Sequence, residues 1–332
     1  FISGFVLMVP FARARLAGGP APSWRHFFGR RVMKIVPSYV LCIALLIAFG
    51  YQTYANAGEA IRDVAFHLLF VHNWFLVTYG SINGVLWSLG VEIQFYLLFP
   101  LFVAAFVRRP LITAAVMLAC ANAWRIWAFA VHGYYLDQRE AQLPAYLDLF
   151  ALGMLAAYMY VDLSLRPALV ERRRWLFSLI MVAGIAGFLF LAGDCYALAH
   201  VQQHWPELWK VQHRTLLAVA IGATALGSLF AFRPLQLVLA NPVLLFLAAI
   251  SYNLYLWHQV VARVLLEHRL PPFAGADPHY DPAWQLRYCL IAVPATIAVA
   301  TIVTYGFERP LLRMRFGPKA TQTGAAKSSA PA

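Results

Sequence analysis

The feature that most constrains this sequence is a series of apolar stretches, each close to the length of a membrane span. A helix needs about 20 apolar residues to cross a bilayer. Inside the bilayer, a helix satisfies its backbone hydrogen bonds within its own segment. The sequence therefore predicts an all-α fold, a polytopic transmembrane helix bundle. The full spans are predicted at 35–51, 84–106, 110–131, 144–161, 175–193, 214–232, 242–266 and 287–307.

Composition supports a membrane protein over a soluble one. Of the 332 residues, 62% are hydrophobic and 12% are charged, whereas soluble domains average about 45–50% and about 25%. The formal charge of +12 would suggest nucleic acid as the partner of a soluble protein. Here the basic residues lie between the apolar stretches, where topology and anionic headgroups account for them. We expect membrane lipid as a partner and no nucleic acid. Because the four cysteines are widely separated, we expect no metal site.

The two ends of the sequence differ from the rest. Residues 1–10 form a ninth apolar stretch of about half a span, which we interpret as a helix of a truncated N-terminal region. About nine spans are then expected here, and ten with a missing first helix. The predicted organisation is one membrane-embedded domain over 1–316, lacking that helix, and a disordered cytoplasmic tail over 317–332.

Loop charges predict the orientation. Lys and Arg concentrate in alternate loops, which the positive-inside rule assigns to the cytoplasm together with both chain ends. The stretch 61–79 is apolar but interrupted by charged and His residues, so we predict that it is interfacial or re-entrant. A span there would place Arg172 and the two arginines after it outside. The basic loops are 11–34, 107–109, 162–174, 233–241 and 308–332.

Five ionisable residues lie within predicted spans: Glu92, Arg125, Asp148, His258 and Arg263. Such groups are costly in a bilayer, so each needs a partner or a function. We predict that Arg125 pairs with Asp148 and that Arg263 reaches toward the interface.

Glu92 and His258 are the candidate chemical groups. Ser88, Glu92 and Tyr96 are spaced four residues apart, which places them on one helix face. Tyr255 and His258 share a face in the same way. A carboxylate and an imidazole can serve general acid–base catalysis or a proton relay, and the residues alone leave both readings open.

A basic cluster precedes the first full span. Arg30, Arg31 and Lys34 lie one turn before helix 35–51, with Pro37 near its start. They could set the topology of the chain, or they could hold an anionic, phosphate-bearing ligand at the cytoplasmic face.

Together these segments resemble the integral-membrane acyltransferase family 3, and they follow the family's order. The family includes O-acetyltransferases of lipopolysaccharide O-antigens, exopolysaccharides and nodulation factors. The matching segments are FISGF (1–5), RRVMKIVPSY (30–39), NGVLWSLGVEIQFYLLFP (83–100), LDLFALGMLAAY (147–158), SYNLYLWH (251–258) and FERPL (307–311).

The resemblance implies transfer of an acyl group, usually acetyl, from a cytoplasmic coenzyme A thioester to a sugar hydroxyl at the bacterial inner membrane. Acetyl-CoA would be a co-substrate, with no bound cofactor, and the acceptor a carbohydrate or lipid-linked glycan. Arg31 and Lys34 match the family's Arg-x-x-Arg motif, which is linked to the acyl donor, and Arg30 could share that role. Lys34 keeps the charge of the second arginine but loses bidentate phosphate binding. Glu92 matches the family's glutamate.

We therefore assign catalytic roles to Glu92, Ser88, Tyr96 and His258. The family's favoured base is a His in a first helix, which would precede residue 1, so a chain with only these residues is expected to be inactive. The predicted supporting residues are Asn83, Trp87, Tyr255 and Arg125. Two alternatives remain open: a proton-coupled transporter or flippase, and a catalytically inactive relative.

Overall fold

The computed structural model describes residues 1–132, 137–200, 206–273, 275, 278 and 281–316. Contacts divide the chain into two compact units. Unit 1 contains residues 1–28 and 43–249, and unit 2 contains residues 29–42 and 250–332. The predicted tail, 317–332, lies outside the described residues.

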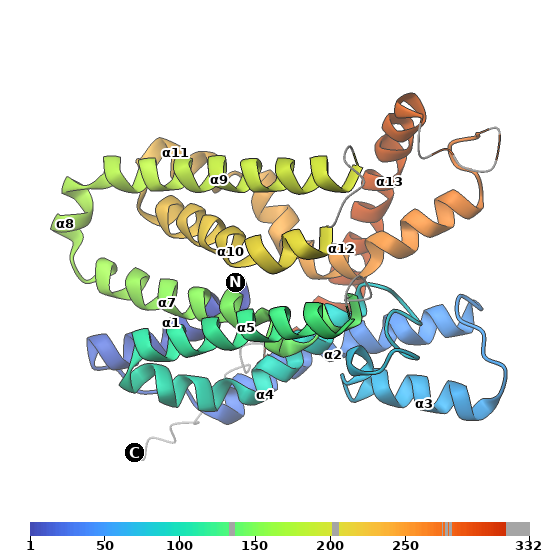
Figure 1. Cartoon of the computed structure of the whole chain (residues 1–332), viewed down its shortest axis with the longest axis horizontal. Coiled ribbons are helices and arrows are strands. Elements are labelled where there is room, and N and C mark those ends of the chain that lie inside the picture. The colour runs from blue at the N-terminus through green and yellow to red at the C-terminus, as the bar shows by residue number, and fades with distance from the viewer. Residues whose placement is uncertain (133–136, 201–205, 274, 276–277, 279–280, 317–332) are drawn as a thin grey trace, which may run out of the picture. The chain divides into compact units, whose positions relative to one another are not determined.

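Unit 1 is built from helices throughout its described part (Figure 1). Its elements are α1 (Ile2–Ala17), the ends of α2 (Trp24–Ala48), α3 (Ala57–Leu68), η1 (His72–Trp74), α4 (Leu86–Arg108), α5 (Pro110–His132), α6 (Asp137–Glu140), η2 (Leu143–Tyr146), α7 (Leu147–Ser164), α8 (Pro167–Arg172), α9 (Arg174–His200), α10 (Pro206–Phe230), α11 (Arg233–Leu239) and the start of α12 (Pro242–Glu267).

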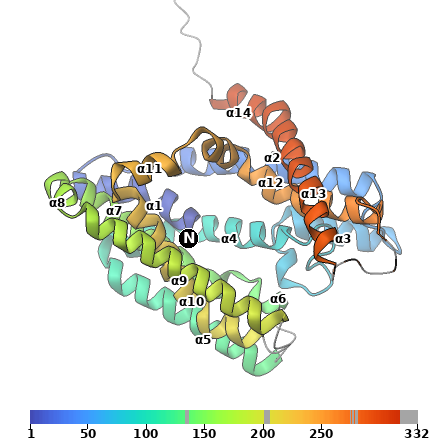
Figure 2. The same ribbon diagram turned by 90° about the horizontal axis from the view of Figure 1, so that it is seen from above.

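Unit 2 contains the middle of α2, most of α12 and a long C-terminal helical segment. That segment begins as α13 (Pro282–Ile302), passes through one π-helical stretch, η3 (Val303–Glu308), and continues as α14 (Arg309–Phe316). Figure 2 shows α13 and α14 as one continuous path. π-helical turns inside longer helices often occur at functional sites.

Among the described residues, eight helices are long and apolar enough to cross a membrane, and they correspond to the eight full spans predicted from the sequence. The protein is an integral membrane protein of the all-α class. The stretch predicted to be interfacial contains only the 12-residue helix α3 and the short η1. A helix of that length rises about 18 Å, which is too short to span the bilayer.

The start of the first full span was predicted wrongly. α2 begins at Trp24, not near residue 35, so Arg30, Arg31 and Lys34 lie inside the helix instead of before it. The cause is aromatic packing. The Trp24 ring stacks on Phe11 of α1, with 4.8 Å between ring centroids. Phe27 stacks on Phe99 of α4 at 5.2 Å. These ring contacts attach the added turns to α1 and α4, although their basic residues lower the hydropathy and none of the turns is fully buried.

Glycine allows α1 and α7 to pack closely. A Cβ on Gly4 would lie 2.4 Å from the backbone oxygen of Phe150 in α7. The Phe150 ring stacks on Phe95 of α4, with centroids 3.7 Å apart. Segments FISGF, WSLGVEIQFYLLFP and LDLFALGMLAAY therefore meet in one core. α9 and α10 also run side by side in both views (Figures 1 and 2).

Candidate active site

Glu92 lies on α4 and accepts hydrogen bonds from two hydroxyl groups. Ser3 of α1 and Tyr96, one turn further along α4, both donate to Glu92 Oε1. Hydrogen bonds to a carboxylate are stronger than those between neutral groups. They hold the half-buried carboxylate in one orientation.

Ser88 lies one turn before Glu92 on the same helix. Its hydroxyl donates to the Val85 carbonyl, with the oxygens 3.1 Å apart. Asn83 lies just before the helix, and its Oδ1 accepts the N–H of Val85 at 3.4 Å. The Trp87 ring packs on Tyr146, with centroids 5.6 Å apart. Asn83 thus contributes to the start of α4, while Trp87 joins α4 to η2.

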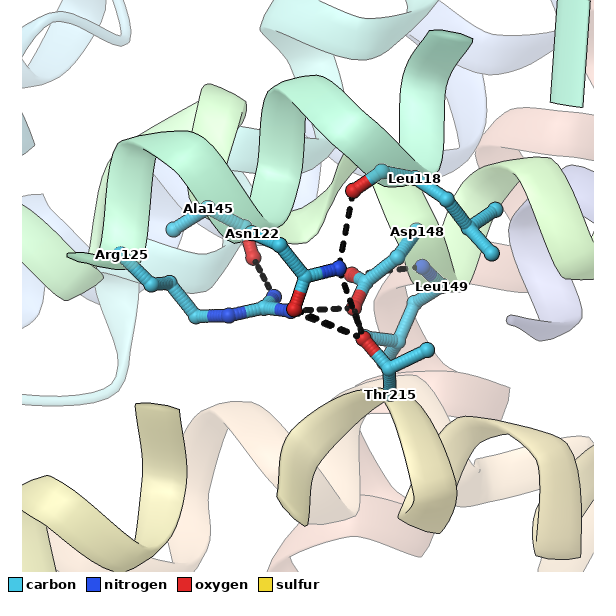
Figure 3. Close-up of polar contacts among 7 residues, drawn as sticks. All are labelled: Leu118, Asn122, Arg125, Ala145, Asp148, Leu149 and Thr215. Atoms are coloured by element: carbon cyan, nitrogen blue, oxygen red, sulfur yellow. Dashed lines mark hydrogen bonds and ion pairs between the residues drawn. The ribbon is translucent and has the colours of Figure 1, made fainter. Parts of the chain in front are cut away.

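A buried ion pair lies at the junction of α5, α7 and α10 (Figure 3). Arg125 and Asp148 are both fully buried, with 2.8 Å between Nη2 and Oδ2. Thr215 donates to Asp148 at 2.7 Å and accepts from Arg125 at 2.9 Å. Arg125 also donates to Asn122 Oδ1 and to the Ala145 carbonyl, at 3.0 Å and 2.7 Å. The predicted Arg125–Asp148 pair is confirmed, and the network explains how two charges are accommodated in the core.

A second polar cluster connects α3 with η1 and connects η1 with α4. The rings of His67 and His72 stack with centroids 4.0 Å apart. His67 Nδ1 lies 3.1 Å from Asp63 Oδ1. Asn73 accepts from Gln94 of α4 at 2.9 Å. Polar residues that interrupt the apolar pattern of 61–79 therefore hold this short segment in place.

Burial and hydrogen bonding shift two pKa values in this segment. Burial tends to raise the pKa of Asp63, but hydrogen bonds from His67, Ser81 and Tyr54 outweigh it and leave the pKa below its ordinary value. Burial and, to a smaller extent, the neighbouring His67 together lower the pKa of the His72 imidazole to about 3. The His72 ring is therefore neutral at physiological pH.

Unit 2 gathers three of the sequence segments around Glu308, which is almost completely buried. Lys34 of α2 forms a salt bridge with Glu308 Oε1. Asn253 of α12 donates to Glu308 Oε2 at 2.8 Å and to Thr304 Oγ1 at 2.9 Å. The Lys34 ammonium also lies 5.7 Å from the centre of the Tyr252 ring. A buried carboxylate thus has a cation and an amide as partners.

Two further basic residues of α2, Arg30 and Arg31, precede Lys34. Arg30 is exposed and Arg31 is half-buried. Since Lys34 already has a carboxylate partner, a phosphate ligand at Lys34 would compete with Glu308. Arg30 and Arg31 lie one turn before Lys34 on neighbouring helix positions and can reach a ligand beside it.

His258 lies on α12 in unit 2, and its Nδ1 is 2.6 Å from the Tyr255 carbonyl oxygen. A carbonyl oxygen only accepts, so Nδ1 carries the proton and Nε2 is the basic nitrogen of the neutral ring. The Tyr255 and His258 rings lie 5.6 Å apart, as their spacing predicted. Arg263, expected to reach toward the interface, donates to Glu267 one turn later at 2.7 Å.

Comparison with known proteins decides the family. The family model for the acyltransferase domain of family 3 matches residues 1–308. The chain belongs to acyltransferase family 3. The resemblance stated from the sequence segments is therefore confirmed.

Three curated proteins illustrate what the chain is similar to. The chain is 22% identical to the peptidoglycan O-acetyltransferase OatA of Listeria monocytogenes, over 88% of this chain and 47% of that protein. It is 25% identical to the O-acetyltransferase OatA of Staphylococcus aureus, over 70% of this chain and 40% of that protein. A regulator of hypoxia-inducible factor 1 from Caenorhabditis elegans is 22% identical, over 73% and 54%. The chain thus spans about half the length of these relatives. No solved structure matches it.

The acyltransferase domain distributes its predicted site residues over both units. Unit 1 holds Ser88, Glu92, Tyr96 and the supporting residues Asn83, Trp87 and Arg125, whereas unit 2 holds Arg30, Arg31, Lys34, Tyr255 and His258. The structure joins Tyr96 to Glu92 and joins Arg125 to Asp148.

Sequence reasoning missed three partners in these clusters: Ser3, Asn253 and Glu308. Each lies inside one of the segments that carry the family resemblance. Their positions in those segments were the only sign in the sequence that these residues belong to the site. Their contact partners are 89, 55 and 274 residues away along the chain, so no local spacing could have paired them.

Proposed function

We propose that this protein transfers an acetyl group from acetyl-CoA to a hydroxyl group of a cell-surface carbohydrate or glycolipid. Membership of acyltransferase family 3 supports the reaction class. The names of its OatA relatives support acetyl as the group and a cell-wall glycan as the acceptor class. The observation that carries the proposal for this chain is the oriented carboxylate of Glu92 among the motif segments of unit 1.

The reaction joins the sugar oxygen to the thioester carbonyl carbon. A base removes the hydroxyl proton as the new C–O bond forms, because a neutral sugar hydroxyl is a poor nucleophile. The carbonyl oxygen becomes an oxyanion, which O–H or N–H donors stabilise. The C–S bond then breaks, and the coenzyme A thiolate recovers the proton. The products are an acetyl ester and free coenzyme A.

Glu92 is our candidate for the proton transfer, either as the acceptor of the hydroxyl proton or as the group that orients a basic imidazole. Ser3 and Tyr96 fix the direction of its carboxylate. His258 keeps a proposed catalytic role, but it belongs to a different motif from the family's favoured base, which the resemblance assigns to the family's first helix.

The donor is proposed to bind at the basic face of α2. Arg30 and Arg31 would hold the phosphates of acetyl-CoA, since guanidinium groups bind phosphate in a bidentate manner. Lys34 would add charge beside them while it remains paired with Glu308. The proposal puts this face on the cytoplasmic side of a bacterial inner membrane, together with both ends of the chain, and the distribution of basic residues among the loops supports that orientation.

Labelled acetyl transfer into envelope glycan tests the proposal. Membranes that contain the full gene product receive acetyl-CoA labelled in the acetyl group, and wild type is compared with Glu92→Gln. We expect label in wild type and a loss of at least about a hundredfold in the variant, the scale of one general-base contribution. Equal labelling of folded wild type and variant would refute the role of Glu92. Absence of label from both proteins would instead favour one of the two alternatives, a transporter or a catalytically inactive relative.

A further inference from the structure

A cluster in unit 1 combines aromatic rings with buried polar groups that lack partners. We call it the aromatic–polar cluster and define it as Trp87, Glu140, Gln142, Tyr146 and Arg214. Its members come from the start of α4, from α6 to η2, and from the first half of α10. The site described above uses only Trp87.

The backbone of the segment between α6 and η2 is anchored by side chains of other elements. Asn73 of η1 donates to the Ala141 carbonyl at 2.7 Å. Arg125 of α5 donates to the Ala145 carbonyl at 2.7 Å. The segment is therefore held on both sides of Gln142, and its side chains are presented from a fixed backbone.

The network of Figure 3 supports the same cluster from a second side. Thr215 bonds to Arg125 and Asp148, and it directly follows Arg214 on α10. Asp148 lies two residues after Tyr146. The buried ion pair thus positions both of the elements that carry Tyr146 and Arg214.

Three side chains in the cluster leave hydrogen-bonding atoms unused in the described part of the chain. Gln142 is fully buried, and neither its Oε1 nor its Nε2 has a partner. Glu140 Oε1 and Arg214 Nη1 are also buried without a partner. Glu140 Oε2, in contrast, lies 3.3 Å from Arg214 and 3.5 Å from Lys210. A buried group without a partner costs about 1–3 kcal/mol, so such a concentration indicates a missing ligand or water.

Of these polar side chains, Arg214 lies beside an aromatic pair. The Trp87 and Tyr146 rings are 5.6 Å apart at an angle of 37°, and both are partly exposed. The Arg214 guanidinium lies 4.7 Å from the centre of the Tyr146 ring. Aromatic rings with a few oriented polar groups are the common composition of small-molecule sites. Planar carboxylate, amide and guanidinium groups pair with adjacent hydroxyls, and aromatic rings pack on the C–H face of a sugar.

We propose that the aromatic–polar cluster binds a sugar unit of the glycan acceptor. This inference rests on the proposed function. Trp87 precedes Glu92 by five residues on α4, which corresponds to about 7.5 Å along the helix axis. Gln142 and Glu140 contact hydroxyl groups of the sugar, Arg214 donates to a ring or hydroxyl oxygen, and the two aromatic rings pack against its carbon face. The loops that carry the cluster are among those with few basic residues.

Gln142→Leu separates a sugar site from a purely structural role. If Gln142 is only a buried amide, replacing it by an apolar side chain of similar size leaves stability unchanged or higher and leaves the kinetics unchanged. If it binds sugar, the acceptor KM rises about tenfold, which is about 1.4 kcal/mol, while the KM for acetyl-CoA stays constant. Arg214→Lys is the second variant, since it keeps the charge but loses the planar donor group. Gln236→Leu on exposed α11 is the matched control.

The experiment uses the full gene product in detergent, with a tetramer of β-1,4-linked N-acetylglucosamine as acceptor. Thermal unfolding of each variant checks folding. An unchanged acceptor KM in Gln142→Leu overturns the proposal, and ordered water would then be the partner of the Gln142 amide. An equal rise in the KM for the acceptor and in the KM for acetyl-CoA also overturns it. If wild type transfers no acetyl, binding of the tetramer is measured by tryptophan fluorescence. Binding that Gln142→Leu weakens tenfold keeps the sugar site while the transferase proposal fails, and absence of binding to wild type overturns both.

Discussion

Replacing Arg125 by methionine removes the positive member of the fully buried ion pair in Figure 3. Asp148 would keep the hydroxyl of Thr215 at 2.7 Å and the N–H of Leu149 at 2.9 Å. Its charge would nevertheless lie in the core without a cation. Breaking a buried pair at one end costs about 3–5 kcal/mol. The two remaining bonds place the expected loss near the lower end, about 3 kcal/mol.

The double variant supplies the sharper result. Asp148→Leu alone strands the Arg125 charge and is also expected to cost about 3 kcal/mol. Arg125→Met with Asp148→Leu leaves an apolar pair, which often costs little compared with the original ions. We therefore expect the double variant to lose about 3 kcal/mol, half of the sum of about 6 kcal/mol for the two single variants, which corresponds to a coupling energy of about 3 kcal/mol between the sites.

Unfolding by SDS titration of the purified protein in micelles, followed by circular dichroism, measures these free energies. Thr113→Val on the exposed first turn of α5 is a suitable control, because its hydroxyl bonds only to the Arg109 carbonyl in the described structure and lies on the surface. Losses that simply add in the double variant would refute the reasoning, since they would mean that the two charges do not depend on each other.

Three further predictions concern packing, the Glu308 cluster and pH. Gly184→Ala should lower the free energy of unfolding by about 1–3 kcal/mol in the SDS titration, because the new Cβ would lie 2.6 Å from the backbone N of Thr224. Gly187→Ala should cost much less, because the nearest atom to its Cβ would be 3.7 Å away. Equal losses in the two variants would contradict this account of helix packing. Lys34→Met should destabilise the protein less than Arg125→Met, since the Lys34 side chain is 36% exposed; a larger loss would show that Glu308 depends wholly on Lys34. Folding lowers the pKa of His72 from 6.5 to about 3, so the free energy of unfolding should decrease by about 1.4 kcal/mol per pH unit as the pH falls from 6 to 4. His72→Phe should flatten that slope. An unchanged slope in the variant would show that other groups cause the pH dependence.

The helices were predictable because hydropathy is a local property. An uninterrupted apolar stretch has one stable form in a bilayer, so eight spans could be recognised from residue types alone. The start of α2 was not predictable in this way. The turns that begin at Trp24 carry basic residues, and they are helical because their aromatic side chains pack on Phe11 and Phe99, which belong to other helices.

The candidate site was predictable only where its residues share a helix. The spacing of Glu92 and Tyr96 predicted one face, and the two side chains are hydrogen-bonded. The pairing of Glu92 with Ser3 joins residues 89 positions apart, and that of Lys34 with Glu308 joins residues 274 positions apart. Such contacts depend on how whole helices pack, which no spacing along one helix reveals.

The sequence by itself determined that this chain is a helical membrane protein, and its ordered segments indicated an acyltransferase of family 3. Those conclusions depend on local hydropathy, on loop charge and on short segments read in order. Only the tertiary structure showed that Ser3 and Tyr96 orient Glu92, that Glu308 holds Lys34, and that the side chain of Gln142 lies buried without a hydrogen-bond partner in the described part of the chain. The physical reason is that burial and hydrogen-bond satisfaction belong to the packed assembly of helices and not to any one of them.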